Sequence, residues 1–441
     1  MSEFFKPASS ADFDKNFAPI KPLMSDTQAH AESSRCLYCY DAPCVAACPT
    51  GIDIPLFIKQ IHSGNTDGAA RTIFESNYLG HACGKVCPTE VLCEGSCVHQ
   101  HQGTPVIEIG RLQTFATRKA MDTNLVIHKT KVTSTKKAAI IGAGPAGLSC
   151  ACELRTAGVE VDVFEARALA SGLTVYGVAP YKITNEEALD EVSYLQKQFG
   201  FRIHYNHPID KSDLSRLEAD YDAIFIGIGL GNTSQLGIPG EELPGVEGAV
   251  EFVEKLRIQR DKIQVPSQVI VLGGGNTAMD AASEAARMGA ESVSLVYRRS
   301  RESMGAYDFE YELARLAGVK GIFHAAPIRV IGEHRAEGVE FIRTNEQEGK
   351  MVPVGGSEFT VPAQLILKAT GQGRQREFLS AIQGLELDSK GNIRCDENSF
   401  QTGNPKYYAA GDAVSGGQEV VNAVANGKKA AKAIIRNLGL G

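Results

Sequence analysis

The sequence predicts an α/β protein with two Rossmann-like dinucleotide-binding domains, the first split by insertion of the second, preceded by a small α-helical domain rich in cysteine. Three observations support this prediction. A glycine-rich turn stands twice between an apolar strand and a helix, at residues 142–147 and 273–278. Eight of the eleven cysteines lie between residues 36 and 97. A strand that ends in Gly-Asp near residue 411 returns the chain to the first fold.

Composition narrows the class of protein. The 441 residues allow two or three domains, and 43% hydrophobic with 22% charged residues is ordinary for a globular protein. A net charge of −7 argues against nucleic acid as a partner, because phosphate binding favours a basic face. No apolar run approaches the roughly eighteen residues of a membrane-spanning helix. The N-terminus does not resemble a secretory signal, so we expect a cytoplasmic protein, where disulfides are rare.

The cysteines form two groups of closely spaced residues: Cys36, Cys39, Cys44 and Cys48, and then Cys83, Cys87, Cys93 and Cys97. Structural zinc usually takes two close pairs separated by a longer loop. Four cysteines in about a dozen residues, with proline directly after the fourth as at Pro49, are typical of bacterial 4Fe–4S ferredoxins, where the fourth cysteine ligates the other cluster. We therefore expect two iron–sulfur clusters with ligands from both groups, ahead of zinc and of disulfides.

The N-terminal domain is expected to be helical. An extended polar arm is expected to lead into a short helix at 26–34. Apolar residues recur at helical spacing over 54–61 and 67–77, residues 106–121 are another helix candidate, and residues 122–135 read as a linker. The expected divisions are 1–128 for the helical iron–sulfur domain, 129–255 and 369–441 for the two parts of the first dinucleotide-binding domain, and 256–368 for the inserted domain.

The first glycine-rich turn lies between a strand at 138–141 and a helix at 148–157. Its residues are Gly142, Ala143, Gly144, Pro145, Ala146 and Gly147. The first glycine allows the tight turn, the second the approach of a pyrophosphate, and the third close packing of helix on strand. The helix N-terminus would face the phosphates. Glu165, directly after the strand at 159–164, is placed to accept a hydrogen bond from a ribose hydroxyl.

The pattern recurs after the strand at 268–272. The turn residues are Gly273, Gly274, Gly275, Asn276 and Thr277, and the next strand, 292–297, ends in Arg298 and Arg299. An acid at the second-strand end suits a free ribose hydroxyl, whereas arginine accommodates a 2′-phosphate. Two such folds imply two nucleotides: Glu165 assigns FAD to the first fold. The arginines favour NADP(H) in the second, although a solvated strand end explains them almost as well.

The C-terminal residues complete the first fold. A strand leads into Gly411 and Asp412, where flavoproteins with two dinucleotide folds bind the FAD ribityl and pyrophosphate groups. The helix that follows, at 419–436, would direct its N-terminus at the flavin. The expected crossings into and out of the inserted domain are residues 226–229 and Ala369, Thr370 and Gly371.

With these residues in place, the chain resembles the electron-input module shared by dihydropyrimidine dehydrogenases and the small subunit of bacterial glutamate synthase. Cys-Leu-Tyr-Cys at residues 36–39, Cys-Pro-Thr-Gly-Ile-Asp-Ile at 48–54 and the second cysteine group look more like the former. The glutamate synthase pattern has a shorter gap at the equivalent of Cys87 to Cys93. The chain ends before any FMN-binding barrel, so it looks like the flavoprotein subunit of the bacterial two-subunit enzyme.

The resemblance implies an interleaved ligand set. One cluster would bind Cys36, Cys39, Cys44 and Cys97, and the other Cys48, Cys87, Cys93 and Gln113. Cys83 would then be a bystander, although spacing alone leaves open whether Cys83 or Gln113 is the last ligand. The resemblance also implies that Val86, Leu173 and Lys182 contact FAD. For the nicotinamide cofactor it implies binding by residues 274–277, Arg298, Arg299 and residues 369–371.

The activity that the resemblance implies is that of an NAD(P)-dependent FAD and iron–sulfur oxidoreductase. Electrons would pass from the nicotinamide through FAD and the clusters to an FMN-containing partner that interconverts uracil or thymine and their 5,6-dihydro forms. No acid–base side chain of this chain is required. NADPH-using relatives carry a third basic residue where this chain has Gly305, so NAD(H) is favoured over NADP(H). The alternative is a glutamate synthase small subunit or a related electron-feeding flavoprotein.

Other kinds of site find less support. Cys150 and Cys152, two apart on one helix, point to different faces and cannot form the redox pair of thioredoxin reductases. Neither a Gly-x-Ser-x-Gly elbow nor a Walker loop occurs, which speaks against hydrolase and kinase chemistry. A zinc-bearing binding module on a degenerate nucleotide fold is the alternative from another class. Such a protein would be colourless and would lack diaphorase activity.

Overall fold

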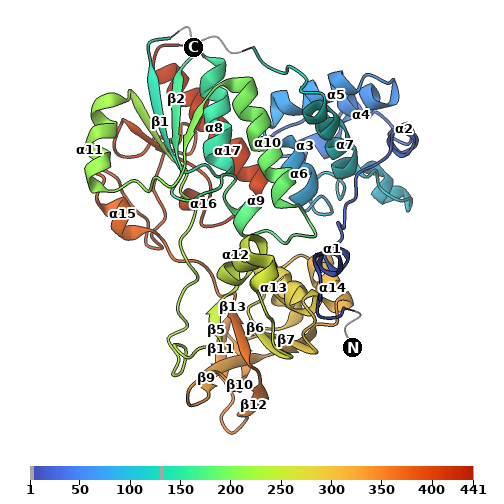
Figure 1. The fold of residues 1–441 in the computed structure, drawn as a ribbon, viewed down its shortest axis with the longest axis vertical. Coiled ribbons are helices and arrows are strands. Elements are labelled where there is room, and N and C mark those ends of the chain that lie inside the picture. Colours follow the sequence, from blue (N-terminus) through green and yellow to red (C-terminus); the bar gives the residue numbers. More distant parts are fainter. Residues whose placement is uncertain (1–3, 130–133, 441) are drawn as a thin grey trace. The chain divides into compact units, whose positions relative to one another are not determined.

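The computed structural model describes residues 4–129 and 134–440, so residues 130–133 of the expected linker lie outside the described residues. The chain forms two compact units (Figure 1). The main unit comprises Ile20–Val175, Lys182–Leu230 and Arg374–Gly441. The insert unit comprises the residues up to Pro19, Tyr176–Tyr181 and Gly231–Gly373. Each unit contains one of the two glycine-rich turns.

The cysteine-rich part of the main unit is helical. Its elements are α2 (Asp26–Ser34), α3 (Pro43–Ala46), α4 (Ile54–His62), α5 (Thr66–Ser76), α6 (Gly80–Val86), the 3-10 helix η1 (Val98–Gln102) and α7 (Ile109–Asp122). An N-cap side chain precedes each of α2, α4 and α5 and accepts a hydrogen bond from the N–H three residues further on. The N-cap residues are Ser25, Asp53 and Asn65. The helices predicted at 26–34, 54–61, 67–77 and 106–121 therefore agree with α2, α4, α5 and α7.

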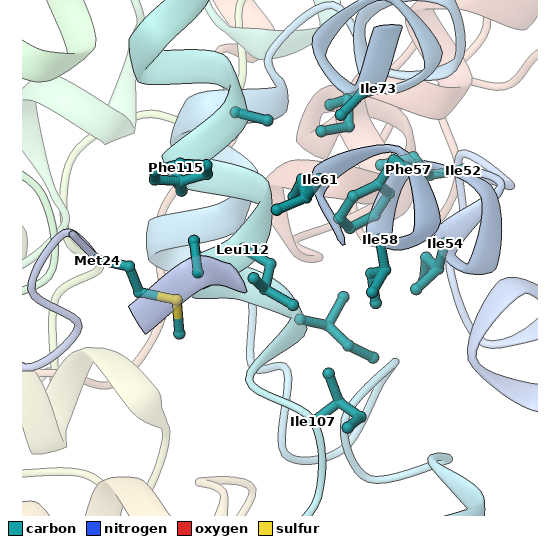
Figure 2. Packing of buried hydrophobic residues seen from close by; sticks show 14 of the residues in the cluster. Met24, Ile52, Ile54, Phe57, Ile58, Ile61, Ile73, Ile107, Leu112 and Phe115 are labelled. Atoms are coloured by element: carbon teal, nitrogen blue, oxygen red, sulfur yellow. The ribbon is translucent and has the colours of Figure 1, made fainter. Parts of the chain in front are cut away.

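An apolar core holds these helices together (Figure 2). Phe57 and Ile58 of α4, Ile73 of α5 and Leu112 of α7 are completely buried in it. Burial of such side chains contributes roughly 1.5–3 kcal/mol each. The cysteines that pack against the edge of this core are Cys36, Cys44, Cys48 and Cys93. The core thus gives the helices a fixed frame from which the cysteines project.

Five parallel strands form the sheet of the main unit, in the order β14-β4-β1-β2-β3. The strands are β1 (Lys137–Ile141), β2 (Glu160–Phe164), β3 (Arg202–His204), β4 (Ala223–Ile226) and β14 (Tyr407–Ala409). The helices are α8 (Pro145–Thr156), α9 (Leu173–Tyr176), α10 (Asn185–Phe199), α11 (Lys211–Asp220), α15 (Arg376–Ser380), α16 (Asp412–Ser415) and α17 (Val420–Asn437). Because β14 pairs with β4, the C-terminal residues complete the first fold, and α17 lies along α8 (Figure 1).

The insert unit contains a second parallel sheet, in the order β5-β13-β6-β7-β8, and a small antiparallel sheet of β9, β10, β11 and β12. The strands are β5 (Val246–Gly248), β6 (Gln268–Leu272), β7 (Ser292–Tyr297), β8 (Lys320–Phe323), β9 (Ala325–Ile331), β10 (Gly338–Gln347), β11 (Lys350–Pro353), β12 (Phe359–Pro362) and β13 (Leu365–Lys368). The helical elements are α1 (Ser10–Asn16), α12 (Ala249–Gln259), η2 (Arg260–Lys262), α13 (Asn276–Arg287), η3 (Arg301–Ser303) and α14 (Asp308–Leu316). The unit therefore repeats the strand–turn–helix pattern of the first fold at β6 and α13.

The fold differs from expectation in two places. Residues Ser10–Asn16 form α1, capped by Ser9, where an extended arm was expected. β5 pairs with β13, so the sheet of the insert unit begins before residue 256, the expected boundary. Both features depend on partners far along the chain, which local spacing does not report. No helix of the described residues is both long and apolar enough to cross a bilayer.

Candidate functional site

One cavity of the main unit, the first cysteine site, is lined by four cysteines: Cys36 after α2, Cys39, Cys44 within α3 and Cys97 before η1. Ile54, Ile58, Ile107 and Ile109 complete its apolar wall. Cys97 belongs to the second group in the sequence, so the fold and not the spacing brings it here. The four sulfurs coincide with the first ligand set implied by the resemblance, while ligation itself stays a prediction.

A second cavity, the second cysteine site, is lined by Cys48, Cys83, Cys87, Cys93 and Gln113. Cys48 comes from the first sequence group, so this site is also assembled from both groups. Val421, in the first turn of α17, lines the same cavity. Cys83 and Gln113 both reach the site, so the choice of its last ligand stays open.

The donor set of the two sites fits iron–sulfur clusters. Burial and the neighbouring Cys36 and Cys97 raise the pKa of the Cys44 thiol to about 12. A hydrogen bond with Cys83, together with burial, raises the pKa of the Cys87 thiol. Thiols this close become thiolates when a bound metal displaces their protons. Within residues 4–129 and 134–440, no three His, Cys, Asp or Glu side chains converge tightly enough to share one metal ion. Cysteine sulfurs around a cavity are the donors that iron–sulfur clusters use.

Gln113 is oriented by the main chain of α6. Its Nε2 donates to the Gly80 carbonyl at 2.6 Å, which leaves the amide oxygen for another partner. A Cβ on Gly84 would lie 2.9 Å from the Gly110 carbonyl oxygen, and a Cβ on Gly110 would lie 2.7 Å from the Gly84 oxygen. The two glycines therefore let α6 and α7 touch, and this contact sets the position of the amide beside the cysteines.

Helix α10 of the first dinucleotide-binding fold contacts α6, the helix that carries Cys83, through buried polar side chains. The Glu191 carboxylate accepts the N–H groups of His81 at 2.6 Å and Ala82 at 3.0 Å. Its complete burial raises its pKa to about 8. Lys85 Nζ lies 2.8 Å from the Glu187 carboxylate, and both side chains are largely buried. Buried polar contacts therefore join α6, which carries Cys83 of the second cysteine site, to α10 within the main unit.

The first glycine-rich turn is packed on two sides and open on the third. A Cβ on Gly142 would lie 2.5 Å from the Gly227 oxygen, and one on Gly147 would lie 2.0 Å from the Gly142 oxygen. On Gly144 a Cβ would meet nothing closer than 3.9 Å. A side chain is excluded for packing at the first and third glycines, whereas the second leaves free space of the kind that a pyrophosphate needs.

Glu165 ties this turn to the end of β2. Its Oε2 accepts the N–H of Ala143 at 2.8 Å, and its Oε1 accepts the N–H of Arg167 at 2.9 Å. Each carboxylate oxygen keeps a second lone pair. The predicted hydrogen bond with a ribose hydroxyl therefore remains geometrically available.

The C-terminal residues reach the same turn. A Cβ on Gly411 would lie 3.1 Å from the Cβ of Ala146, and one on Gly427 of α17 would lie 2.1 Å from the Ala146 oxygen. Burial raises the pKa of Asp412, whose Oδ1 accepts the N–H of Gln418 at 3.0 Å. Gly411 and Asp412 thus lie beside the predicted FAD turn.

The three further residues predicted to contact FAD come from separate elements. Leu173 begins α9, directly after Gly172, whose added Cβ would lie 3.0 Å from the Gly144 Cα. Val86 ends α6 and is half-buried, and Lys182 is buried shortly before α10. Leu173 therefore adjoins the open side of the turn, and the flavin contacts of all three stay predictions.

The second glycine-rich turn has the same design in the insert unit. A Cβ on Gly273 would lie 2.4 Å from the Ala369 oxygen, and one on Gly274 would lie 2.6 Å from the Tyr297 ring. A Cβ on Gly275 would meet nothing within 4 Å. The crossing at Ala369, Thr370 and Gly371 follows β13 and so lies beside this turn at the same edge of the sheet.

The loop after β7 is fixed against the turn. The Gly274 carbonyl accepts the N–H of Ala306 at 2.9 Å, and Asn276 Oδ1 accepts the N–H of Tyr307 at 3.0 Å. Thr277, the next turn residue, is exposed. Among the described residues neither the exposed Arg298 nor the half-buried Arg299 uses its guanidinium in a hydrogen bond or ion pair. A Cβ on Gly305 would meet nothing within 4 Å. The loop thus presents two guanidinium groups, those of Arg298 and Arg299, and open space around Gly305.

Two residues of the turns were not found from the sequence. Gly172 faces the open side of the first turn, and the Tyr297 ring packs on Gly274 of the second. Gly172 stands directly before the predicted Leu173, and Tyr297 directly before the predicted Arg298, so proximity to those residues was the available signal.

Comparison with known proteins identifies both parts of the chain. Residues 136–427 match the family described as pyridine nucleotide-disulphide oxidoreductase. Residues 13–125 match the family described as dihydropyrimidine dehydrogenase domain II, 4Fe-4S cluster. The two matches agree with the predicted order of a helical cluster domain before a pair of dinucleotide folds.

Relatives match over nearly the whole chain. The glutamate synthase [NADPH] small chain of Halomonas elongata is 36% identical, covering 98% of this chain and 94% of its own. The NAD-dependent dihydropyrimidine dehydrogenase subunit PreT of Escherichia coli is 35% identical, covering 94% and 95%. In structure, FprA of Mycobacterium tuberculosis in complex with NADPH is similar in fold, with a TM-score of 0.58 and 21% identity over 69% of this chain and 85% of its own. The chain therefore belongs to the pyridine nucleotide-disulphide oxidoreductase family, as an FAD- and NAD(P)-dependent oxidoreductase with an N-terminal 4Fe–4S domain, in the superfamily of PreT subunits and glutamate synthase small chains.

Proposed function

We propose that this chain is the electron-input subunit of a dihydropyrimidine dehydrogenase. It exchanges hydride between NAD(H) and FAD and passes electrons through two 4Fe–4S clusters to an FMN-containing catalytic subunit. That subunit interconverts uracil or thymine and their 5,6-dihydro forms. The PreT relatives and the dihydropyrimidine dehydrogenase-type cluster domain support this assignment.

One observation carries the proposal: α17 joins the second cysteine site to the FAD turn within the main unit. Val421 lines the cysteine site, and Gly427 further along the helix lies on Ala146. FAD bound at the turn would exchange paired electrons with a nicotinamide and single electrons with the clusters. The residues of this chain would bind and orient FAD. Gly144 leaves space for its pyrophosphate, and Glu165 accepts a hydrogen bond from its ribose hydroxyl.

Electrons leave, on this proposal, at the first cysteine site. Cys39 lines that site and also a surface hollow that includes Tyr40 and Leu56. The Tyr40 side chain is 99% exposed, and Leu37 and Leu56 beside it are also exposed. If a catalytic subunit bound over this hollow, only Cys39 would lie between it and the predicted cluster. Exposed aromatic residues are frequent anchors of such contacts.

Replacing Tyr40 with alanine is expected to slow electron delivery to the catalytic subunit by about 30-fold when the subunit is below saturation, because anchor residues contribute about 2 kcal/mol or more. Reduction of ferricyanide by NADH should remain unchanged, since the side chain is exposed and supports no core. Leu316→Ala, at a residue 67% exposed on α14, is the control and should change neither rate. Equal partner-linked rates in both variants would contradict the assigned exit.

We propose NAD(H) as the nicotinamide partner. Arg298 and Arg299 can meet a 2′-phosphate, but the position of a third base is occupied by Gly305. Charge-assisted hydrogen bonds to phosphate are roughly twice as strong as neutral ones, so the missing base weakens NADPH more than NADH. The NAD-dependent PreT relatives support this choice.

Gly305→Arg is expected to tighten NADPH binding about tenfold, because one charged hydrogen bond contributes about 1.5 kcal/mol or more. NADH binding should change little, since NADH has no phosphate at that position. The free space around Gly305 means that the side chain is accommodated without a clash. Calorimetric titration measures both affinities, and Gly305→Gln controls for size without charge. A gain for NADH equal to that for NADPH would count against a 2′-phosphate contact.

A glutamate synthase small chain is the second candidate, because relatives with that name match equally well. The longer gap between Cys87 and Cys93 favours the dihydropyrimidine dehydrogenase pattern. Reconstitution with each type of catalytic subunit distinguishes the two functions.

The direct test is an anaerobic optical spectrum with an iron count, followed by titration with NADH and with NADPH. Flavin and iron–sulfur bands, about eight irons per chain and bleaching by NADH support the proposal. Uracil reduction should then appear only when an FMN-containing catalytic subunit is added. A colourless zinc protein unchanged by either nucleotide would overturn it, as would uracil reduction by this chain alone.

A further inference from the structure

The N-terminal arm, residues 4–17, lies on the insert unit, although the residues that follow it belong to the main unit. Asn16 Nδ2 donates to the Arg287 carbonyl at 2.7 Å, and Arg287 Nη1 donates to the Asn16 carbonyl at 2.6 Å. A Cβ on Gly289 would lie 2.3 Å from the Lys6 nitrogen, so the main chains touch. The arm is therefore a docked segment.

Aromatic and charged contacts reinforce this docking. Phe13 and Phe17 are buried and stack on each other with ring centres 4.3 Å apart. The Arg260 guanidinium lies over the Phe13 ring at 5.3 Å and pairs with Asp14 at 3.0 Å. One face of α1 thus packs against the rest of the insert unit.

A second segment from outside the inserted stretch joins the arm. Residues Tyr176–Tyr181 also belong to the insert unit, and Tyr181 Oη donates to Asp280 Oδ1 at 3.0 Å. The Arg287 guanidinium lies 4.4 Å from the centre of the Tyr181 ring and 4.7 Å from that of Phe4. The two segments therefore meet at one arginine of α13.

Directly after the arm, the chain is anchored on the main unit. Lys21 Nζ donates to Thr89 Oγ1 at 2.7 Å, and Arg111 Nε donates to the Pro22 carbonyl at 2.9 Å. Only three residues lie between the anchor at Phe17 and that at Lys21, so the two anchors are four residue steps apart. Four residues span at most about 14 Å when fully extended, so these two anchors cannot move further apart while both hold.

We propose that the N-terminal arm is a strap that limits how far the insert unit can move from the main unit. An inserted domain needs two chain crossings, whereas this one has five, at residues 19/20, 175/176, 181/182, 230/231 and 373/374. A short tether raises the effective concentration of one site at another. The consequence for hydride exchange between the two nucleotides rests on the proposed function, but the restraint on movement does not.

Lengthening the strap tests the idea in the full chain. About twelve glycine and serine residues inserted between Ala18 and Pro19 add up to about 43 Å of reach and leave the docking contacts intact. The control carries the same insertion between Glu348 and Gly349, in the turn from β10 to β11, which connects nothing across units. Non-cysteine spin labels at the exposed Leu316 and Arg216 report the distance between units, and stopped-flow absorbance reports flavin reduction by NADH.

The strap insertion should broaden the distance distribution and slow flavin reduction by about 10- to 100-fold, the range expected for misplaced reactants, with unchanged NADH affinity. The control insertion should change none of these. An unchanged distance distribution in the strap variant would overturn the proposal, whether or not reduction slows. If the natural chain shows no reduction by NADH, the proposed function fails, and the distance measurement still decides on the strap.

Discussion

Replacing Cys97 with alanine is expected to empty the first cysteine site and leave the second filled, although Cys97 stands among the cysteines of the second group. Replacing Cys48 should do the reverse. Each variant should keep about four of about eight irons, because each site receives one thiolate from the other sequence group. Iron analysis with low-temperature electron paramagnetic resonance measures how many clusters remain and whether the two variants lose different signals.

Cys83→Ala is the matched control for this pair. Cys83 lines the second site but is not in the implied ligand set, so this variant should keep all its iron. Gln113→Ala should instead lose the second cluster or change its signal. A loss of half the iron in Cys83→Ala, with none in Gln113→Ala, would assign the last ligand to the cysteine. Loss of the same signal in Cys97→Ala and Cys48→Ala would contradict the interleaved arrangement.

A carboxylate placed on the second glycine of either turn should separate the two nucleotide sites. Gly144→Glu is expected to yield a chain without FAD, whereas Gly275→Glu should keep FAD that NADH no longer reduces. The protein itself leaves space at both positions, since a Cβ would meet nothing closer than 3.9 Å at Gly144 and nothing within 4 Å at Gly275. The loss arises because the new charge would face a pyrophosphate, and two like charges at about 4 Å repel by about 4 kcal/mol near a protein surface.

Flavin fluorescence after heat release measures bound FAD, and stopped-flow absorbance measures its reduction. The control is Gly355→Ala, at a glycine with open space and no role in either turn. FAD retained by Gly144→Glu at the natural level would refute the first assignment. Normal reduction of Gly275→Glu by NADH would refute the second.

Local patterns predicted most of the regular structure and much of the candidate sites. The strands at 268–272 and 292–297 agree with β6 and β7, because a buried parallel strand is a short apolar run bounded by a turn. The glycine turns could be located because their glycine spacing stands directly between an apolar strand and a helix. Cys150 and Cys152 are fully buried within α8, in agreement with their reading as small apolar residues.

Tertiary partners explain what the sequence did not predict. Residues 4–17 look like a polar arm because the surface that Phe13 and Phe17 cover is formed by residues far along the chain. The same reason hid β5, which becomes a strand only by pairing with β13. Spacing could not assign the last ligand of the second cysteine site, because Cys83 and Gln113 reach it from different helices.

The contacts that the N-terminal arm and Tyr181 make with Arg287 of α13 have a practical consequence for dividing the protein into fragments. A fragment limited to residues 231–373 would contain the second glycine-rich turn and both of its sheets. It would lack Phe13, Phe17 and Tyr181, so the apolar surface that they cover would be exposed to water. Such a fragment is expected to aggregate when expressed alone, because newly uncovered apolar patches promote self-association. The strands of the insert unit come from one continuous stretch of the chain, but the compact unit draws on three stretches, and transplanting it into another protein would require carrying all three.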